Sequence, residues 1–594
     1  MHSQKRLMAT LALGAVTGWA HAFEVTGVVR SGGDPVAGAM VTVQNLLTGN
    51  NGEPASVTLF SDRRGRYAAT LDDRVTADDL LLRAARLGYE MAGQSRQAGP
   101  DSLWVDFELS PTDNIAAQAP PSAWLGRFPL DDRDARFVVG QCAGCHGFPD
   151  GKVQHFASNL RHLGGGLLAP QEIRTLHENA WRAAIQYMRA MTFYYAPGMA
   201  PRWGFDDRSP DFAALLTPEF GLFTADEEDA AATAIARYLP LDYSRLDIAD
   251  YAAAETPLAL SAVGRIEEFD LRTGGWTREV AWTPGSDFAW IVEDSADRLG
   301  RLNPDTGEIR WLELPGSAQG PQGPHTINAG RDGSIWISLE ESYGMARFEP
   351  SDESWKVYPG FGQGAIAHDT CLDHERFVKF DRRGRLWLTL IGENKLAELD
   401  VATGEIQKYE MPHMEGEVPF HAALYGCVMA SDAEMIWISQ LNGIVGGFNT
   451  RTKELETVID LPFGAIPHRF AIDDNDIIYV ALSGDGQILV YDTRARKELR
   501  RIDLPDRNSA PYATTWDPDR RVVWVAASNS DAIYRLDPKT GDAAVIPLPR
   551  KRTYLRMVDI DRRNGDLWTT YAPLPIGRGP NFAVRVVPGD TSAK

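Results

Sequence analysis

Hydrophobic and polar residues follow three different patterns along the chain. From Phe23 to about Leu109, apolar and polar positions alternate with a period of two, and Gly and Pro separate the short runs. This alternation is typical of antiparallel strands buried on one face, so it predicts a β-sandwich over residues 23–112. Further along, Thr224-x-x-Glu227 opens an amphipathic helical pattern that ends near Leu239, and residues 130–242 are predicted to form an all-α domain.

The third pattern is a repeat that begins near residue 257. An aromatic residue closes one strand-like run in each repeat, and the next such aromatic follows after 42 to 51 residues. This spacing suits one four-stranded blade, and seven marks predict a seven-bladed β-propeller over residues 257–590. The run from Gly264 to Phe269 is predicted to supply the outer strand of the last blade. The marks are Trp290, Trp336, Trp387, Trp437, Tyr479, Trp524 and Trp568.

The first 22 residues have the features of a secretory signal peptide. Lys5 and Arg6 precede a short apolar run from Leu7 to Ala20, and Ala20-His21-Ala22 fits an A-x-A cleavage site. The mature chain is therefore expected to begin at Phe23, in the periplasm or outside the cell. No apolar run reaches the ~20 residues that span a bilayer, so no membrane span is expected.

Composition narrows the range of partners. The formal charge of −21 and the pI near 5.1 oppose binding to phosphate backbones and to anionic lipid, which clustered Lys and Arg recognise. Nucleic acid is therefore not expected as a partner. At 594 residues, of which 44% are hydrophobic, the chain is long enough for several packed domains.

A haem attachment motif, Cys142-x-x-Cys145-His146, lies in the predicted helical domain. In C-x-x-C-H both thiols bind the haem vinyl groups, and the histidine reaches the iron from one side. The sequence therefore predicts one covalent haem c. The alternative is a zinc or redox C-x-x-C pair, which lacks a second ligand pair nearby.

The sixth iron ligand has several candidates. Met199 is favoured, because its loop Ala196-Pro197-Gly198-Met199-Ala200-Pro201 resembles the methionine loop of cytochromes c. Met188 is the next candidate, although its apolar helical spacing also fits a core position. An open iron site is a further alternative. The remaining candidates are Met191, His155, His162 and His177.

Polar residues recur where the innermost strand of each predicted blade begins. Such positions converge on one mouth of a propeller channel, where they could bind a metal, a second cofactor or an anionic substrate. The alternative is that each histidine only bonds a backbone carbonyl at a loop. The candidate catalytic residues are His325, Arg376, His421, His468, Tyr512 and Arg556, and the candidate second metal site comprises His325, His368, His374, His421 and His468, with Arg469 beside them.

Two cysteines remain outside the haem motif, Cys371 and Cys427. In an oxidising compartment, and in loops of neighbouring blades, they are expected to form a disulfide. The alternative is that Cys371, in His368-x-x-Cys371-x-x-His374, is a metal ligand.

Each predicted domain resembles a known family. Pro35-Val36-Ala37-Gly38, Ser61-Asp62 and Leu87-Gly88-Tyr89 resemble the carboxypeptidase regulatory-like β-sandwich, which implies a structural or docking module without catalytic residues. The motif and helices of residues 130–242 resemble class I cytochrome c.

The propeller repeat resembles virginiamycin B lyase (streptogramin lyase), a family that uses a blade histidine, a Glu and magnesium. There the acid is expected three residues after the blade aromatic. Leu339 follows Trp336 at this spacing and Leu482 follows Tyr479, so the histidine-bearing blades are predicted to lack their acidic partner.

Together these features favour an oxidoreductase that passes electrons from a substrate or partner at the propeller mouth to haem c. A redox partner protein, such as another cytochrome or a cupredoxin, and a small-molecule substrate are the expected partners. The first alternative is a non-catalytic electron-transfer or scaffold subunit. The second is a streptogramin-type C–O lyase.

Overall fold

The computed structural model describes most of the chain, which is largely β-sheet with a few helices. Along the chain, three helices separate the N-terminal strands from the later strands: α1 (Arg133–Cys145), α3 (Pro170–Met191) and α5 (Ala225–Tyr238). No described helix is long and apolar enough to cross a membrane. The described residues are 23–45, 54–71, 80–96, 102–129, 131–145, 147–149, 153–155, 157–159, 169–191, 225–259, 263–273, 275–362, 365–412, 423–462, 464–573 and 581–589.

The N-terminal strands form two facing sheets. In one sheet, β1 (Phe23–Ser31) pairs with β2 (Asp34–Pro35), β5 (Arg66–Leu71), β8 (Ser102–Trp104) and β9 (Phe107–Glu108). The other contains β4 (Pro54–Phe60), β3 (Met40–Asn45), β6 (Leu80–Ala85) and β7 (Ala92–Arg96). Alternate residues such as Val25, Val41 and Leu82 are fully buried in their shared core, as the period of two predicted.

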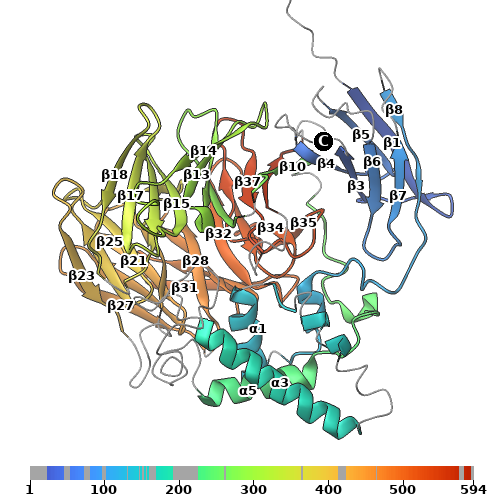
Figure 1. Cartoon of the computed structure of the whole chain (residues 1–594), viewed down its shortest axis with the longest axis horizontal. Helices are drawn as coiled ribbons and strands as arrows, with labels where there is room; N and C mark the ends of the chain where they lie inside the picture. Colours follow the sequence, from blue (N-terminus) through green and yellow to red (C-terminus); the bar gives the residue numbers. More distant parts are fainter. Residues whose placement is uncertain are drawn as a thin grey trace, which may run out of the picture.

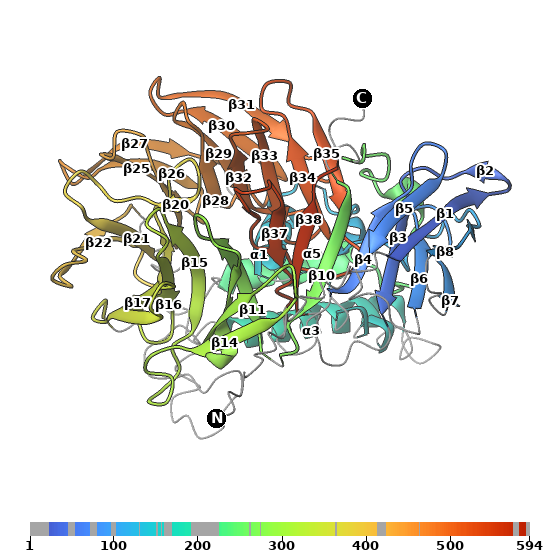
Figure 2. The same ribbon diagram turned by 90° about the horizontal axis from the view of Figure 1, so that it is seen from above.

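The strands beyond residue 264 form seven four-stranded sheets arranged radially, which is a seven-bladed propeller (Figures 1 and 2). Each of the seven marker aromatics lies in the second strand of its blade and is buried. The short strand β20 (Phe377–Val378) adds to the second blade. The blades are, in order: β11 (Thr277–Trp282), β12 (Ala289–Glu293), β13 (Arg298–Leu302), β14 (Ile309–Glu313); β15 (Pro324–Gly330), β16 (Ile335–Leu339), β17 (Gly344–Glu349), β18 (Ser354–Tyr358); β19 (Ala367–Thr370), β21 (Leu386–Leu390), β22 (Lys395–Leu399), β23 (Ile406–Glu410); β24 (Leu424–Met429), β25 (Met435–Gln440), β26 (Ile444–Asn449), β27 (Glu454–Asp460); β28 (Pro467–Ile472), β29 (Ile477–Leu482), β30 (Gln487–Asp492), β31 (Lys497–Asp503); β32 (Pro511–Asp517), β33 (Val522–Ala527), β34 (Ala532–Leu536), β35 (Ala543–Pro547); and β36 (Asp559–Ile560), β37 (Leu567–Thr570), β38 (Phe582–Val587), β10 (Arg265–Asp270).

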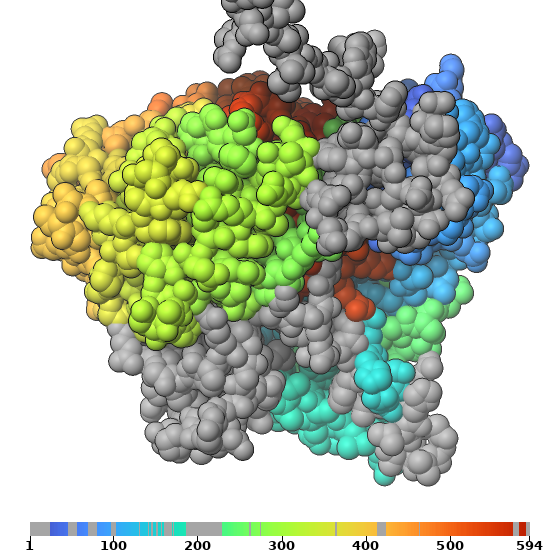
Figure 3. Space-filling model, turned by 45° about the horizontal axis from the view of Figure 1, so that its top comes forward, coloured from blue at the N-terminus to red at the C-terminus, as the bar shows by residue number. Residues whose placement is uncertain are grey.

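Strand β10 closes the propeller, as predicted, and also joins it to the sandwich. One edge of β10 pairs with β38 and the other with β4, which gives one continuous eight-stranded sheet. Ser56 Oγ donates to Glu268 Oε2 across the join at 2.5 Å. The last blade therefore has no open outer edge, and the sandwich lies at the opposite side of the molecule from the middle blades (Figure 3).

Candidate functional site

Seven buried side chains, one from each blade, gather in the channel. We call this set the channel ring. Six of them form a closed series of contacts that returns from Arg556 to His325, and Arg278 joins the series at His325. The centroids of the aromatic side-chain rings are 4.5 Å apart for His325 and His368, 4.2 Å for His368 and Tyr425, and 4.9 Å for Tyr425 and His468. His468 and Tyr512 are 4.7 Å apart, and Arg556 Nη2 lies 3.3 Å from His325 Nε2. The channel ring comprises Arg278, His325, His368, Tyr425, His468, Tyr512 and Arg556.

A repeated backbone conformation directs these side chains into the channel. In six blades, the residue two positions before the ring residue has a positive φ, and in six blades a β-bulge interrupts the inner strand at the ring residue. For Ile366 and Ile466, whose φ values are 47° and 49°, this conformation is costly because their β-branched side chains crowd the backbone. Strain of this kind concentrates at functional sites. The residues with positive φ are Gly323, Ile366, Ala423, Ile466, Ala510 and Tyr554.

The three histidines of the ring are neutral near pH 7. Burial lowers the pKa of His468 to about 3. Burial also lowers the pKa of His325 and His368 well below the usual value, and the nearby guanidinium groups lower both further. Neutral imidazoles can accept hydrogen bonds or ligate a metal.

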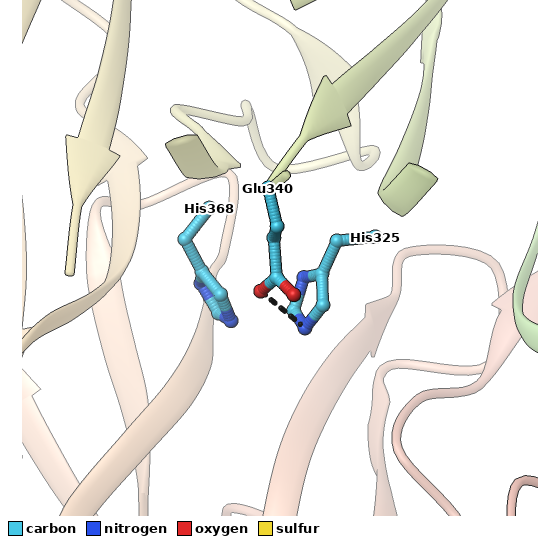
Figure 4. Close-up of side chains that lie close together, drawn as sticks. All are labelled: His325, Glu340 and His368. Carbon is cyan, nitrogen blue, oxygen red and sulfur yellow. Dashed lines mark ion pairs between the residues drawn. The ribbon is translucent and has the colours of Figure 1, made fainter. Parts of the chain in front are cut away.

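An acid does accompany the ring histidines, and the prediction that they lack one was wrong. Glu340 Oε1 lies 3.0 Å from His325 Nε2. Ligand atoms of His325, Glu340 and His368 all lie within 4.8 Å of one another (Figure 4). Glu340 is four residues after Trp336, one beyond the expected position, because Leu339 ends β16 in the core and the following residue turns into the channel.

The same triad has neighbours that oppose a metal ion. Histidine and carboxylate are ordinary ligands for zinc and similar ions, so the donor set fits a cation. However, Arg278 Nη2 contacts His325 Nε2, and Arg556 Nη2 is 3.3 Å from the same nitrogen. A metal ion at His325 Nε2 would therefore approach two guanidinium cations, which repel it.

Beside the ring, a second group of charges is fully paired. Arg469 donates to Asp369 Oδ2 at 2.9 Å and also contacts Glu279. These side chains and Arg376 line a cavity of about 20 Å³. This volume accommodates about one water molecule, so it is too small for an organic substrate.

The structure brings together five of the residues predicted at the channel mouth: His325, His368, His468, Tyr512 and Arg556. Arg469 lies directly beside them in the paired group. His374 and Arg376 belong to the other end of the inner strands, because β20, which follows them directly, pairs with the end of β15. Arg376 nevertheless lines the cavity beside the channel ring with Arg469, and a role for His374 stays a prediction. His421 lies outside the described residues.

Sequence reasoning missed three members of the site: Arg278, Tyr425 and Glu340. The dipeptides Pro324-His325, Pro467-His468 and Pro511-Tyr512 begin three inner strands in the same way. Carrying that register to the strands that contain Val280 and Cys427 would have identified Arg278 and Tyr425.

Cys371 and Cys427 form a disulfide, with their Cα atoms 4.7 Å apart. The bond joins the inner strands of the third and fourth blades. The thiol of Cys371 is consumed by this bond, so the structure does not support Cys371 as a metal ligand.

The predicted haem segment lies at the C-terminal end of α1. Cys142 and Cys145 are three positions apart on this helix, and Cys142 is half-buried. His146, Met199 and His162 lie outside the described residues, as do the side chains of Cys145, Met188 and Met191. Among the other candidates, His155 is exposed, and His177 is buried and accepts a hydrogen bond from Trp181 Nε1 at 2.9 Å.

The C-x-x-C segment is held directly on the propeller. Ser528 Oγ donates to the carbonyl oxygen of Ala143, inside the C-x-x-C sequence, at 2.7 Å. Asn529 accepts from Phe148 N at 2.7 Å and donates to the Phe148 carbonyl at 3.0 Å. Both residues belong to the turn after β33 in the sixth blade.

This docking site lies at the ring end of the channel. Ala510, which packs in the same core as α1, is two residues before Tyr512 of the ring. Ser528 Oγ also contacts the Ala510 carbonyl at 3.2 Å, so one hydroxyl bridges the C-x-x-C segment and the strand that carries Tyr512. On the fifth blade, Arg136 of α1 forms an ion pair with Asp485.

Comparisons with known proteins give distant similarities. No protein family model matches the chain. A stretch of 109 residues is 23% identical to the methylosome protein WDR77 of Xenopus laevis, and it covers 18% of this chain and only 29% of that protein. Among solved structures, virginiamycin B lyase from Staphylococcus aureus is 16% identical, with a TM-score of 0.45 over 54% of this chain and 99% of that chain. The β-propeller domain of Cps50 (Swd1) from Myceliophteria thermophila is 12% identical, with a TM-score of 0.42 over 54% of this chain and 98% of that chain. The description of the propeller therefore rests on its own strand pairing.

Proposed function

We propose that the protein is a periplasmic c-type cytochrome that takes electrons from a small molecule at the channel ring. Cys142 and Cys145 would hold one haem, His146 would bind its iron, and the bound group would supply one-electron transfer. Met199, or else Met188, would be the second protein ligand of the iron. The electrons leave to a redox partner protein such as another cytochrome or a cupredoxin. In this proposal residues 130–242 are a cytochrome c domain, and the sandwich is a docking module of the carboxypeptidase regulatory-like type.

One observation carries the proposal: the docking of the C-x-x-C segment on the ring end of the propeller. Ser528 and Asn529 fix its backbone with three hydrogen bonds to Ala143 and Phe148. All three bonds are buried, where such bonds define one geometry and loss of a partner costs the most. An electron carrier joined to the propeller only by a flexible linker would not need this fixed position. Electron transfer between the channel ring and a haem on α1, in contrast, requires a fixed, short separation.

The fit of the motif to haem rests on the spacing of its donors. Positions 142 and 145 are on one helix and three apart, so they share a helical face. This spacing supports attachment of both cysteines to one flat group. The protein's own contribution is to orient this group relative to the ring and to limit its contact with water.

A metal-dependent lyase is the second candidate, because His325, Glu340 and His368 form a compact donor set. The two functions differ in what they need at His325 Nε2. A lyase of that type requires a cation there, and the cytochrome does not. Titration with Mg²⁺, compared between the native protein and Glu340→Gln, separates them.

The test of the cytochrome proposal is covalent haem content. The full chain, with its first 22 residues, is expressed in a bacterial host that has c-type maturation, and haem per chain is measured by mass and by haem stain on a denaturing gel. We expect one haem, and none in the double variant Cys142→Ser/Cys145→Ser. The matched control, Cys371→Ser/Cys427→Ser, should retain it. A folded native chain without covalent haem would overturn the proposal.

A further inference from the structure

We infer that Arg278, His325 and Arg556 form a binding site for a small oxyanion of the carboxylate or phosphate class. We call these three residues the donor cluster. The inference deepens the proposed function by naming the ligand class of the channel ring. It rests on that function only for the anion's role as a substrate, because binding itself does not require haem.

Three polar groups converge on one atom that cannot satisfy them. Arg278 Nη2 contacts His325 Nε2, Arg556 Nη2 lies 3.3 Å from it, and Glu340 Oε1 lies 3.0 Å from it. A neutral Nε2 has one lone pair and accepts one hydrogen bond well. A protonated Nε2 would instead point its hydrogen at two cations. An oxyanion at this point has enough lone pairs to accept from both guanidinium groups and from the imidazole.

Arg556 is a buried cation without a carboxylate at hydrogen-bonding distance among the described residues. Its side chain is 5% exposed, and its nearest acid contact, from Nε to Glu279 Oε1, is 4.0 Å long. That carboxylate already contacts Arg469. The Nε atoms of Arg556 and Arg278 have no hydrogen-bond partner. A charge removed from water in this way requires a counter-ion, so the missing partner points to an anionic ligand.

Hydroxyl groups extend the donor cluster on one side. Arg556 Nη2 donates to Tyr512 OH at 2.6 Å, and Tyr512 OH contacts Tyr425 OH. Since a tyrosine hydroxyl can rotate its hydrogen, these two groups can turn toward an anion held by Arg556. Such a site would combine charge with directional hydrogen bonds, as oxyanion sites do.

The carboxyl groups nearest to the donor cluster lie beside Arg278 and not beside Arg556. Burial raises the pKa of Glu340 to about 8, so this carboxyl group is mostly protonated at pH 7. Burial also raises the pKa of Asp294, whose Oδ2 is 3.0 Å from Arg278. Arg556 has no comparable partner, so the positive potential is strongest between Arg556 and His325.

Isothermal titration calorimetry with the full-length protein tests this inference. Inorganic phosphate, sulfate, acetate and oxalate are the probes. We expect one saturable site, and the ranking of phosphate against oxalate tells which anion class fits. Arg556→Gln should weaken binding about tenfold or more, since one charge-assisted hydrogen bond is lost. Arg496→Gln, at a side chain that is 52% exposed, is the matched control and should bind normally.

Several outcomes would overturn the inference. Binding of none of the four anions would do so, as would equal binding by native protein and Arg556→Gln with unchanged circular dichroism. A second variant, Arg278→Gln, should also weaken anion binding, and it provides the test if Arg556→Gln does not fold. Binding of Mg²⁺ or Zn²⁺ that depends on Glu340, without anion binding, would replace the anion site by a metal site. The haem-free variant Cys142→Ser/Cys145→Ser should bind anions normally, so failure of the haem proposal and failure of the anion site are distinguishable.

Discussion

Two arginines, Arg469 and Arg556, are buried in the propeller channel, and their environments differ. Arg469 donates to Asp369 at 2.9 Å and contacts Glu279, so two carboxylates surround it. Arg556 has Tyr512 and His325 as its near neighbours and a carboxylate only at 4.0 Å. In the first arrangement the guanidinium charge is paired within the protein, and the adjoining cavity has room for about one water molecule. The second is incomplete without a ligand, so the comparison separates a structural part of the channel from a binding part.

Removal of each guanidinium group should therefore lower stability by very different amounts. Arg469→Met leaves Glu279 and Asp369 buried without their partner, and we expect the free energy of unfolding to fall by about 3–5 kcal/mol. Arg556→Met removes a cation that lacks a partner, and we expect a loss below about 1 kcal/mol in anion-free buffer. Urea unfolding followed by tryptophan fluorescence measures both. Equal losses in the free energy of unfolding for the two variants would contradict the distinction between a paired Arg469 and an unpaired Arg556.

A smaller effect concerns Glu340, next to the donor cluster. Its pKa is raised from the ordinary 4.5 to about 8 by burial, so between these values the folded state holds a proton that the unfolded state has released. Stability from this group is complete below pH 4.5 and is lost as the pH rises through 8. Arg278, Asp294, His325, His368, Arg469 and Arg556 are the charged and titratable groups that face it.

For one proton, the expected loss is about 2 kcal/mol between pH 6 and pH 7.5, at about 1.4 kcal/mol per pH unit. Glu340→Gln keeps the neutral form at every pH, so its stability should fall less over this interval. Urea unfolding at several pH values compares the two proteins. Parallel curves would mean that Glu340 is ionised in the folded protein.

Much of the fold could be predicted because its signals are local. The seven aromatic marks lie in the second strand of each blade, and the run near Ile266 closes the last blade, as the repeat indicated. The pairing of β10 with β4 was not predictable in the same way, because it joins strands that are more than 200 residues apart and neither strand encodes its outer neighbour.

The candidate site could be predicted only in part. His325 and His468 stand out because histidine is rare in strands, whereas Arg278 and Tyr425 look like ordinary strand residues. Five of the six left-handed positions before the ring are filled by residues other than glycine, such as Ile366 and Ala510, so the turn has no common sequence signature. The docking of Ala143 on Ser528 depends on a contact between residues 385 positions apart, which no local pattern encodes.

The account's central claim is that the haem segment and the donor cluster act as one unit. The most direct test is the midpoint potential of the covalent haem, measured by spectroelectrochemistry with and without a saturating concentration of phosphate. We expect phosphate to lower the potential of the native protein, because an anion near the haem stabilises the ferric charge, and to leave the potential of Arg556→Gln unchanged. If calorimetry shows that the native protein binds phosphate and its midpoint potential does not change with phosphate, the claim is contradicted.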